Sequence, residues 1–252
     1  ASEPDAPALK NGIPTKEPAF GLQAYWIEES QTEEARTKGY TVVDTSTVIV
    51  THLTEILRKQ GWEVLTRAEV QAILDTVSKA YPRLVEELVP NTLPLGTVQR
   101  VLQNLLKERV PIRDIVTILE TLIDHGQSVK DPEALTEFVR QALSRVITKQ
   151  YQLPDGTMAV LTLEPNFERQ ILEAIEQGTG INFELMQKMM RAFDRIMKDE
   201  KLQMVQPVLV CSPHLRRHIK RIAERVMPSL VVLSSAEIWP DVKLVSMGVV
   251  EP

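Results

Sequence analysis

Residues 207–233, PVLVCSPHLRRHIKRIAERVMPSLVVL, decide the fold of the last hundred residues of this 252-residue chain. Val208–Cys211 has the composition of a buried strand, and Ser212 followed by Pro213 is typical of a helix start. Apolar residues then recur on one helical face, at Leu215, Ile219, Ile222 and Val226. Leu230–Leu233 has the length of a second strand. Strand, helix and strand with short links predict a right-handed βαβ unit with parallel strands.

The residues on both sides of this unit continue the alternation of strands and helices. Met158–Leu163 is a strand candidate, and helices are expected over 165–176 and 183–198. Leu244–Val250 is expected to form a final edge strand. Residues 145–252 are therefore predicted to form an α/β subdomain.

The middle of the chain, residues 65–144, is predicted to be all-helical. Thr66 and Glu69 fit a capping box. Asp131 followed by Pro132 is a cap with a first-turn proline, and it opens the last of four amphipathic helices. The stripes expected to be buried contain Val70, Leu74, Val98, Val101, Leu102, Leu105, Ile118, Leu119, Leu122, Leu135 and Val139. Four helices with short connections suffice for a small helical subdomain.

The N-terminal residues 1–44 are predicted to form a small α/β unit. Strands are expected at 23–27 and at Tyr40–Val43, with a short helix over 33–38 between them. Asp44 is expected to cap a helix that runs to about Gln60 and ends at Gly61. The fold class is α+β with several subdomains: a small α/β unit, a helical middle and an α/β end with its βαβ unit.

Composition and charge exclude several classes of protein. Hydrophobic residues make up 43% of the chain, which excludes wholesale disorder. The 29 Lys and Arg against 34 Asp and Glu give a net charge of −5, unlike that of a dedicated nucleic-acid binder. The single cysteine cannot form an internal disulfide. No apolar run approaches the roughly 18 residues of a membrane span, so no span is expected.

The sequence lacks the patterns that usually accompany catalysis. Neither glycine-rich nucleotide motif occurs, and Gly178–Gly180 is better interpreted as a helix end than as a phosphate loop. His214 and His218 have a zinc-compatible spacing, but the two arginines between them disfavour a dication. Cys211 is either a packed core thiol or, beside a cationic helix, a thiol of lowered pKa. We therefore expect no enzyme, no cofactor and no metal.

One basic run offers an alternative function as a nucleic-acid-binding regulator. It consists of Arg216, Arg217, Lys220, Arg221 and Arg225. These residues either follow a phosphate backbone or form the outer side of an amphipathic helix. Since no stacking aromatic residues accompany them, the second interpretation is favoured and no nucleic-acid partner is expected.

Phe20 stands out because it lies in a turn flanked by proline and glycine. Glu17 precedes it by three residues. Phe20 is either an apolar anchor for a partner, with a polar residue at its rim, or a plug that packs the small unit onto the following helix. From the residues alone, the plug is the favoured interpretation.

A series of motifs in fixed order resembles the cytoplasmic part of the FHIPEP family, the export gate proteins of flagellar and virulence type III secretion. The matching stretches are EPAFGL (17–22), WI (26–27), GYTVVD (39–44), THL (51–53), ELVP (87–90), VLQNLL (101–106), VPIRD (110–114), TILETL (117–122), PVLV (207–210) and LVVLS (230–234). The resemblance covers nearly all of the chain after Ile13. Residues 40–44 and 51–53 favour the flagellar branch, although the virulence branch stays open.

The resemblance implies a docking platform at the cytoplasmic face of the bacterial inner membrane. Such proteins form nonameric rings that bind export chaperone–substrate complexes and other export apparatus components, and help to order export. It also implies that residues 1–44 are the family's second subdomain and 45–64 a helix of the first. Residues 65–144 and 145–252 would be the third and fourth subdomains.

The resemblance also implies where partners bind. The family's docking surface is a hydrophobic dimple between its first two subdomains, and its positions fall here on Glu17, Phe20 and Thr51, with Pro18 and Val43 as weaker neighbours. On this basis the anchor interpretation of Phe20 takes precedence. The chain departs from the family at residues 58–67, and it lacks the membrane half and most of the first subdomain.

Overall fold

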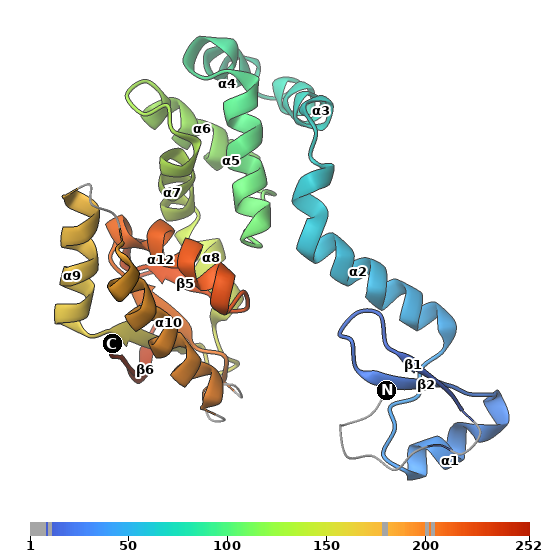
Figure 1. Ribbon diagram of the computed structural model, residues 1–252. Coiled ribbons are helices and arrows are strands. Elements are labelled where there is room, and N and C mark those ends of the chain that lie inside the picture. Colours follow the sequence, from blue (N-terminus) through green and yellow to red (C-terminus); the bar gives the residue numbers. More distant parts are fainter. Residues whose placement is uncertain (1–8, 10–11, 178–180, 200–201, 203–204) are drawn as a thin grey trace. The chain divides into compact units, whose positions relative to one another are not determined.

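The computed structural model describes residues 9, 12–177, 181–199, 202 and 205–252 (Figure 1). Gly178–Gly180, expected to end a helix, lies outside the described residues. The chain divides into two compact units, residues 1–65 and residues 66–252. Each unit has its own secondary structure.

The small unit is built on a β-hairpin and two helices. Strand β1 (Ile13–Lys16) pairs antiparallel with β2 (Gln23–Trp26), and the 3₁₀ turn η1 (Glu29–Gln31) leads into α1 (Thr32–Thr37). A long helix, α2 (Thr45–Val64), ends the unit. Its small apolar core consists of Leu9, Ala35 and Tyr40, with Tyr25, Ile27 and Val42 packed against it.

Two expectations for this unit are wrong. Tyr40–Val43 was expected to be a strand, but it has no regular secondary structure and is not a strand of the β1–β2 sheet. Tyr40 instead points into the core, where its ring meets that of Tyr25 edge-on at 5.9 Å. Helix α2 does not end at Gly61 but continues to Val64, because a glycine of ordinary backbone conformation only weakens a helix.

Helix α2 carries an apolar face that the small unit leaves in solvent. Its residues are Ile49, Leu53, Ile56 and Leu57, all of them exposed. The expected periodicity is therefore present, while the described residues of the small unit do not bury it. Asp44 caps the helix as predicted, its Oδ1 accepting the N–H of Thr47 at 2.6 Å.

The large unit begins with helices that bury apolar side chains. They are α3 (Arg67–Ser78), α4 (Pro82–Glu86), the π-helical turn η2 (Glu87–Thr92), α5 (Leu95–Lys107), α6 (Ile115–Gly126), α7 (Pro132–Ala142) and α8 (Ser144–Tyr151). The predicted stripes are buried on α3, α5, α6 and α7. Asp131 caps α7 as expected, accepting the N–H groups of Glu133 and Ala134. Thr66 supplies its half of the expected capping box by accepting the N–H of Glu69.

The α/β part of the large unit is a four-stranded parallel sheet with the order β5-β4-β3-β6. Its elements are β3 (Met158–Leu163), α9 (Pro165–Glu176), α10 (Phe183–Lys198), β4 (Val208–Cys211), α12 (Pro213–Val226), β5 (Val232–Ser234), the 3₁₀ turn η3 (Ser235–Glu237) and β6 (Leu244–Val250). Helix α12 packs against both α9 and α10 (Figure 1). The predicted βαβ unit, edge strand and α+β class are confirmed.

A buried cluster of charges joins the helical and α/β parts of the large unit. Arg216 on α12 is 1% exposed, and its guanidinium binds two carboxylates. Its Nε and Nη2 donate to Glu137 at 2.6 and 2.5 Å, and its Nη1 and Nη2 donate to Glu108 at 2.6 and 3.0 Å. Arg140 on α7 donates to Glu237 at 2.5 Å. The two arginines and Glu237 are buried, and Glu108 and Glu137 keep only 15% of their side chains exposed, so the stability of the cluster depends on its hydrogen-bond geometry.

Candidate functional site

The loop that joins β1 to β2 is closed by one residue, Glu17. Its backbone N–H donates to the carbonyl of Leu22 at 2.8 Å, and its carbonyl accepts the N–H of Gly21 at 2.9 Å. Its carboxylate accepts two more amides, from Ala19 at 2.8 Å and from Phe20 at 2.7 Å. The arrangement resembles a helix N-cap, in which a side-chain oxygen binds the free amides two and three residues on.

This closure turns two neighbouring side chains in opposite directions. Ala19 is buried, whereas Phe20 is 61% exposed. Gly21 completes the loop with a φ of +72°, a conformation that side chains other than glycine rarely adopt. Phe20 is therefore held in solvent by the loop's own hydrogen bonds, and it does not pack as the plug that residue-level reasoning favours.

The five predicted site residues line one hollow of about 690 Å³ in the small unit. They are Glu17, Pro18, Phe20, Val43 and Thr51. They come from the β1–β2 loop, the extended segment before α2, and the second turn of α2. The structure thus brings together residues up to 34 positions apart in the sequence. Their role in binding stays a prediction.

Helix α2 presents its first two turns to this hollow. Thr47, Val48 and Thr51 line it from positions that share one helical face. Asp44 fixes where the helix begins, and its bond to Thr47 lowers the pKa of the Asp44 carboxyl. The carboxylate is thus well suited to hold the start of the helix, and with it Thr51, beside the loop.

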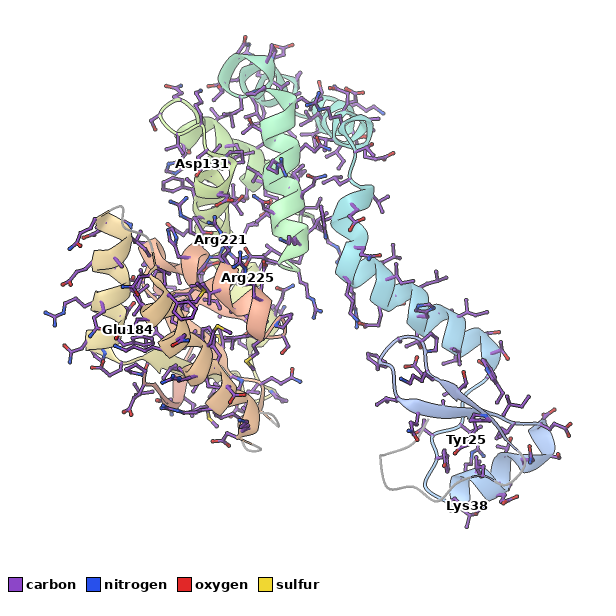
Figure 2. All side chains as sticks on the ribbon, viewed as in Figure 1. Tyr25, Lys38, Asp131, Glu184, Arg221 and Arg225 are labelled. Carbon is purple, nitrogen blue, oxygen red and sulfur yellow. The ribbon has the colours of Figure 1, made fainter. Side chains whose placement is uncertain are left out.

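Further residues of the hollow were missed by sequence reasoning. Trp26 lines the hollow and is exposed. It belongs to the family motif WI (26–27), but it was not among the predicted site residues. Tyr25 and Tyr40 line the hollow from the core side (Figure 2 labels Tyr25). Strand alternation gives no signal for Trp26, because Ala24 and Trp26 share one face of β2, and yet Ala24 is buried while Trp26 is exposed. The hollow therefore combines aromatic walls with hydroxyl and carboxylate groups.

The basic helix is not a free cationic face. Arg216 is buried in the charge cluster, Arg217 pairs with Asp131 at 3.1 Å, and Arg221 pairs with Glu133 at 2.7 Å. Figure 2 shows Arg221 and Arg225 on α12. Lys220 donates to the carbonyl of Leu230. Acidic side chains from α7 and its cap form ion pairs with three of the arginines. The geometry therefore disfavours a role of this helix in binding a nucleic-acid phosphate backbone.

The groups considered for catalysis lie in unreactive settings. Cys211 is buried, and burial raises the pKa of its thiol, so the alternative of a lowered pKa is wrong. Burial followed by the charges of Arg217 and Arg221 lowers the pKa of His218. Across residues 9, 12–177, 181–199, 202 and 205–252, no group of three or more His, Cys, Asp or Glu side chains could hold a metal ion.

The carboxyl ends of the parallel strands, where α/β proteins often bind ligands, are closed by carboxylates. Glu164 follows β3 and accepts the N–H groups of Asn166 and Phe167 at the start of α9. Glu168 accepts the N–H of Ser212 at the end of β4. Glu237 accepts the N–H of Ser234 at the end of β5. These backbone N–H groups thus already donate to glutamate carboxylates of the chain itself, so they are not available to a phosphate group.

Among the helices of the described residues, none is both long enough and apolar enough to cross a membrane.

Comparison with known proteins gives the family. A sequence model of the FHIPEP family matches residues 1–243. The flagellar biosynthesis protein FlhA of Bacillus subtilis is 39% identical over 248 residues, which cover 96% of this chain and 37% of that protein. The chain thus spans little more than a third of the length of this relative. It belongs to the FHIPEP family, as its motifs predicted.

Solved structures agree with this assignment. The Chlamydia pneumoniae CdsV protein superposes with a TM-score of 0.79 at 23% identity, covering 100% of this chain and 70% of that chain, a likeness of fold. The nonameric SctV-C of EPEC, solved by cryo-EM, has a TM-score of 0.74 at 26% identity and covers 99% of this chain and 76% of that chain. The fold is therefore that of the C-terminal domains of type III export gate proteins.

Proposed function

We propose that this chain is a docking platform of the flagellar type III export gate, which binds export chaperone–substrate complexes and helps to order their export. The observation that supports the proposal best is the exposure of Phe20 at the edge of the 690 Å³ hollow. Its loop is held by four hydrogen bonds of Glu17. An aromatic side chain fixed in solvent beside a hollow with aromatic walls and a polar rim is the arrangement expected of an interface anchor.

The proposal extends to assembly and location. The relative SctV-C forms a nonamer, and we propose that the longer protein containing this chain forms such a ring at the cytoplasmic face of the bacterial inner membrane. There it would also meet other components of the export apparatus. We propose a non-enzymatic role, consistent with the buried thiol and the carboxylate-closed strand ends.

The test is a calorimetric titration with an export chaperone bound to its substrate, taken from the same organism. Removing an anchor side chain of this kind costs about 2 kcal/mol or more, which is about a 30-fold loss of affinity. We expect Phe20→Ala to lose binding by that factor. Phe183→Ala is the matched control, because Phe183 is 73% exposed at the start of α10 in the large unit.

Each outcome has a definite meaning. Loss of binding in Phe20→Ala alone supports the docking site. Equal affinities for the wild type, Phe20→Ala and Phe183→Ala would contradict it. If the wild type does not bind, the titration is repeated with the longer chain of the relatives' length, and a second failure would contradict the docking function.

A further inference from the structure

The side chain of Glu17 is directed at the backbone of its own loop. Its Oε1 accepts the N–H of Ala19 at 2.8 Å, and its Oε2 accepts the N–H of Phe20 at 2.7 Å. The residue is half-buried, while Phe20 is exposed. An acidic residue at a docking surface is usually understood as a charge that meets a cationic group of the partner. The observed geometry gives this carboxylate a different task.

We propose that Glu17 is a positioning residue, which holds loop 17–22 closed so that Phe20 stays exposed beside the hollow, and which affects partner docking through Phe20. This inference rests on the proposed docking function, since it assigns a role within the same site. It differs from that function in one respect: the carboxylate acts on the free protein, before any partner arrives.

The physical reason lies in what the loop would do without the carboxylate. The amides of Ala19 and Phe20 would then bind water, and only two backbone hydrogen bonds would close the loop. An exposed phenylalanine next to a hollow with aromatic walls would lower its contact with water by folding inward. Because binding requires the exposed state, apparent affinity falls in proportion to the fraction of molecules that retain it.

The first measurement is amide hydrogen exchange in the free protein, followed by NMR. Glu17→Ala removes both side-chain acceptors, so we expect exchange at Ala19 and Phe20 to rise about tenfold or more, as for a lost local protection. Glu33→Ala is the control, because Glu33 is an exposed acid on α1 that pairs with Arg36 instead. Unchanged exchange in Glu17→Ala would overturn the inference whatever the partner does.

The second measurement is a double-mutant cycle on the binding of the chaperone–substrate complex. If Glu17 acts through Phe20, Glu17→Ala weakens binding about tenfold in the wild-type background and less than about twofold in the Phe20→Ala background. Additive losses would overturn the inference, because they would mean that Glu17 meets the partner on its own account.

Glu17→Gln separates charge from hydrogen bonding. It removes the charge but leaves one oxygen that accepts an amide, so we expect a smaller loss of binding than in Glu17→Ala. Equal losses in the two variants would favour a direct charge contact and overturn the inference. If the wild type binds no chaperone–substrate complex, the docking function fails first, and the exchange result still decides whether the carboxylate holds the loop.

Discussion

At the scale of single residues, Arg216 is the central cation of the buried charge cluster in the large unit. It binds the carboxylates of Glu108 and Glu137, which come from the helical part, while Arg216 itself lies on the α/β part. Removing one partner of such a cluster leaves the others charged and out of water. That situation costs far more than the loss of an exposed ion pair.

We therefore expect Arg216→Met to lower the free energy of unfolding by about 3–5 kcal/mol. Arg221→Met is the matched control on the same helix. Arg221 pairs with Glu133 with 57% of its side chain exposed, so its loss should cost about 1 kcal/mol or less. Denaturant unfolding of the whole chain measures both, and similar values for the two variants would contradict the structural role of the cluster.

The same cluster predicts how stability depends on pH. Burial alone would raise the pKa of Glu108, but the charges of Arg140 and Arg216 outweigh it and lower that pKa to about 2. In the unfolded chain the pKa returns to the ordinary value of 4.5. The unfolded state thus binds more protons, so this contribution is complete above pH 4.5 and is lost as the pH falls from there towards 2.

Glu108→Gln is expected to flatten the loss of stability in that window. The measurement is a series of denaturant unfolding curves between pH 2 and pH 7 for the wild type and the variant. A wild-type slope that the substitution leaves unchanged would show that other carboxylates carry the acid dependence.

At the scale of elements, helix α2 runs through Gly61, where the sequence predicted its end. The backbone there has an ordinary helical conformation, and a Cβ atom would meet nothing within 4 Å. Gly61→Ala should therefore stabilise α2 by about 0.5–1 kcal/mol, because alanine loses less conformational freedom on folding. Slower hydrogen exchange of the α2 amides would report the gain. Gly39→Ala should destabilise the unit, since Gly39 has a φ of +83°.

Elements that depend on local patterns could be predicted from the sequence, and those that depend on distant partners could not. The βαβ unit of residues 207–233 follows from a cap, a first-turn proline and apolar periodicity within 27 residues. Strand β1 was missed because Ile13–Lys16 contains Pro14 and becomes a strand only by pairing with β2. Tyr40–Val43 has strand-forming residues but is not a strand of the β1–β2 sheet.

The candidate site divides in the same way. Phe20 and Glu17 stand close together in an unusual turn, so residue-level reasoning could single them out. Thr51 came from the family resemblance, because nothing local marks a threonine on a helix as part of a site. The hydrogen bonds of Glu17 to the loop depend on backbone geometry, and Arg216 meets partners 79 and 108 residues away. The Glu17 contacts are local, to amides two and three residues on, whereas the Arg216 contacts have no signature in sequence spacing.

At the scale of the whole molecule, the two units differ in what they contain. The unit of residues 1–65 contains the hollow and the exposed aromatic side chains around it. The unit of residues 66–252 contains the larger core and the buried charges. We expect partner binding to be sensitive to changes in the first unit, and stability to changes in the second.

The most direct test of the docking function is photo-crosslinking from position 20. A photoreactive phenylalanine is placed at Phe20 or, as the control, at Phe183, in the longer protein and in cells that build flagella. We predict that position 20 crosslinks to an export chaperone or its bound substrate and that position 183 does not. Crosslinks of chaperone–substrate complexes from position 183 alone, or equally from both positions, would contradict the assignment of the docking site to the Phe20 loop.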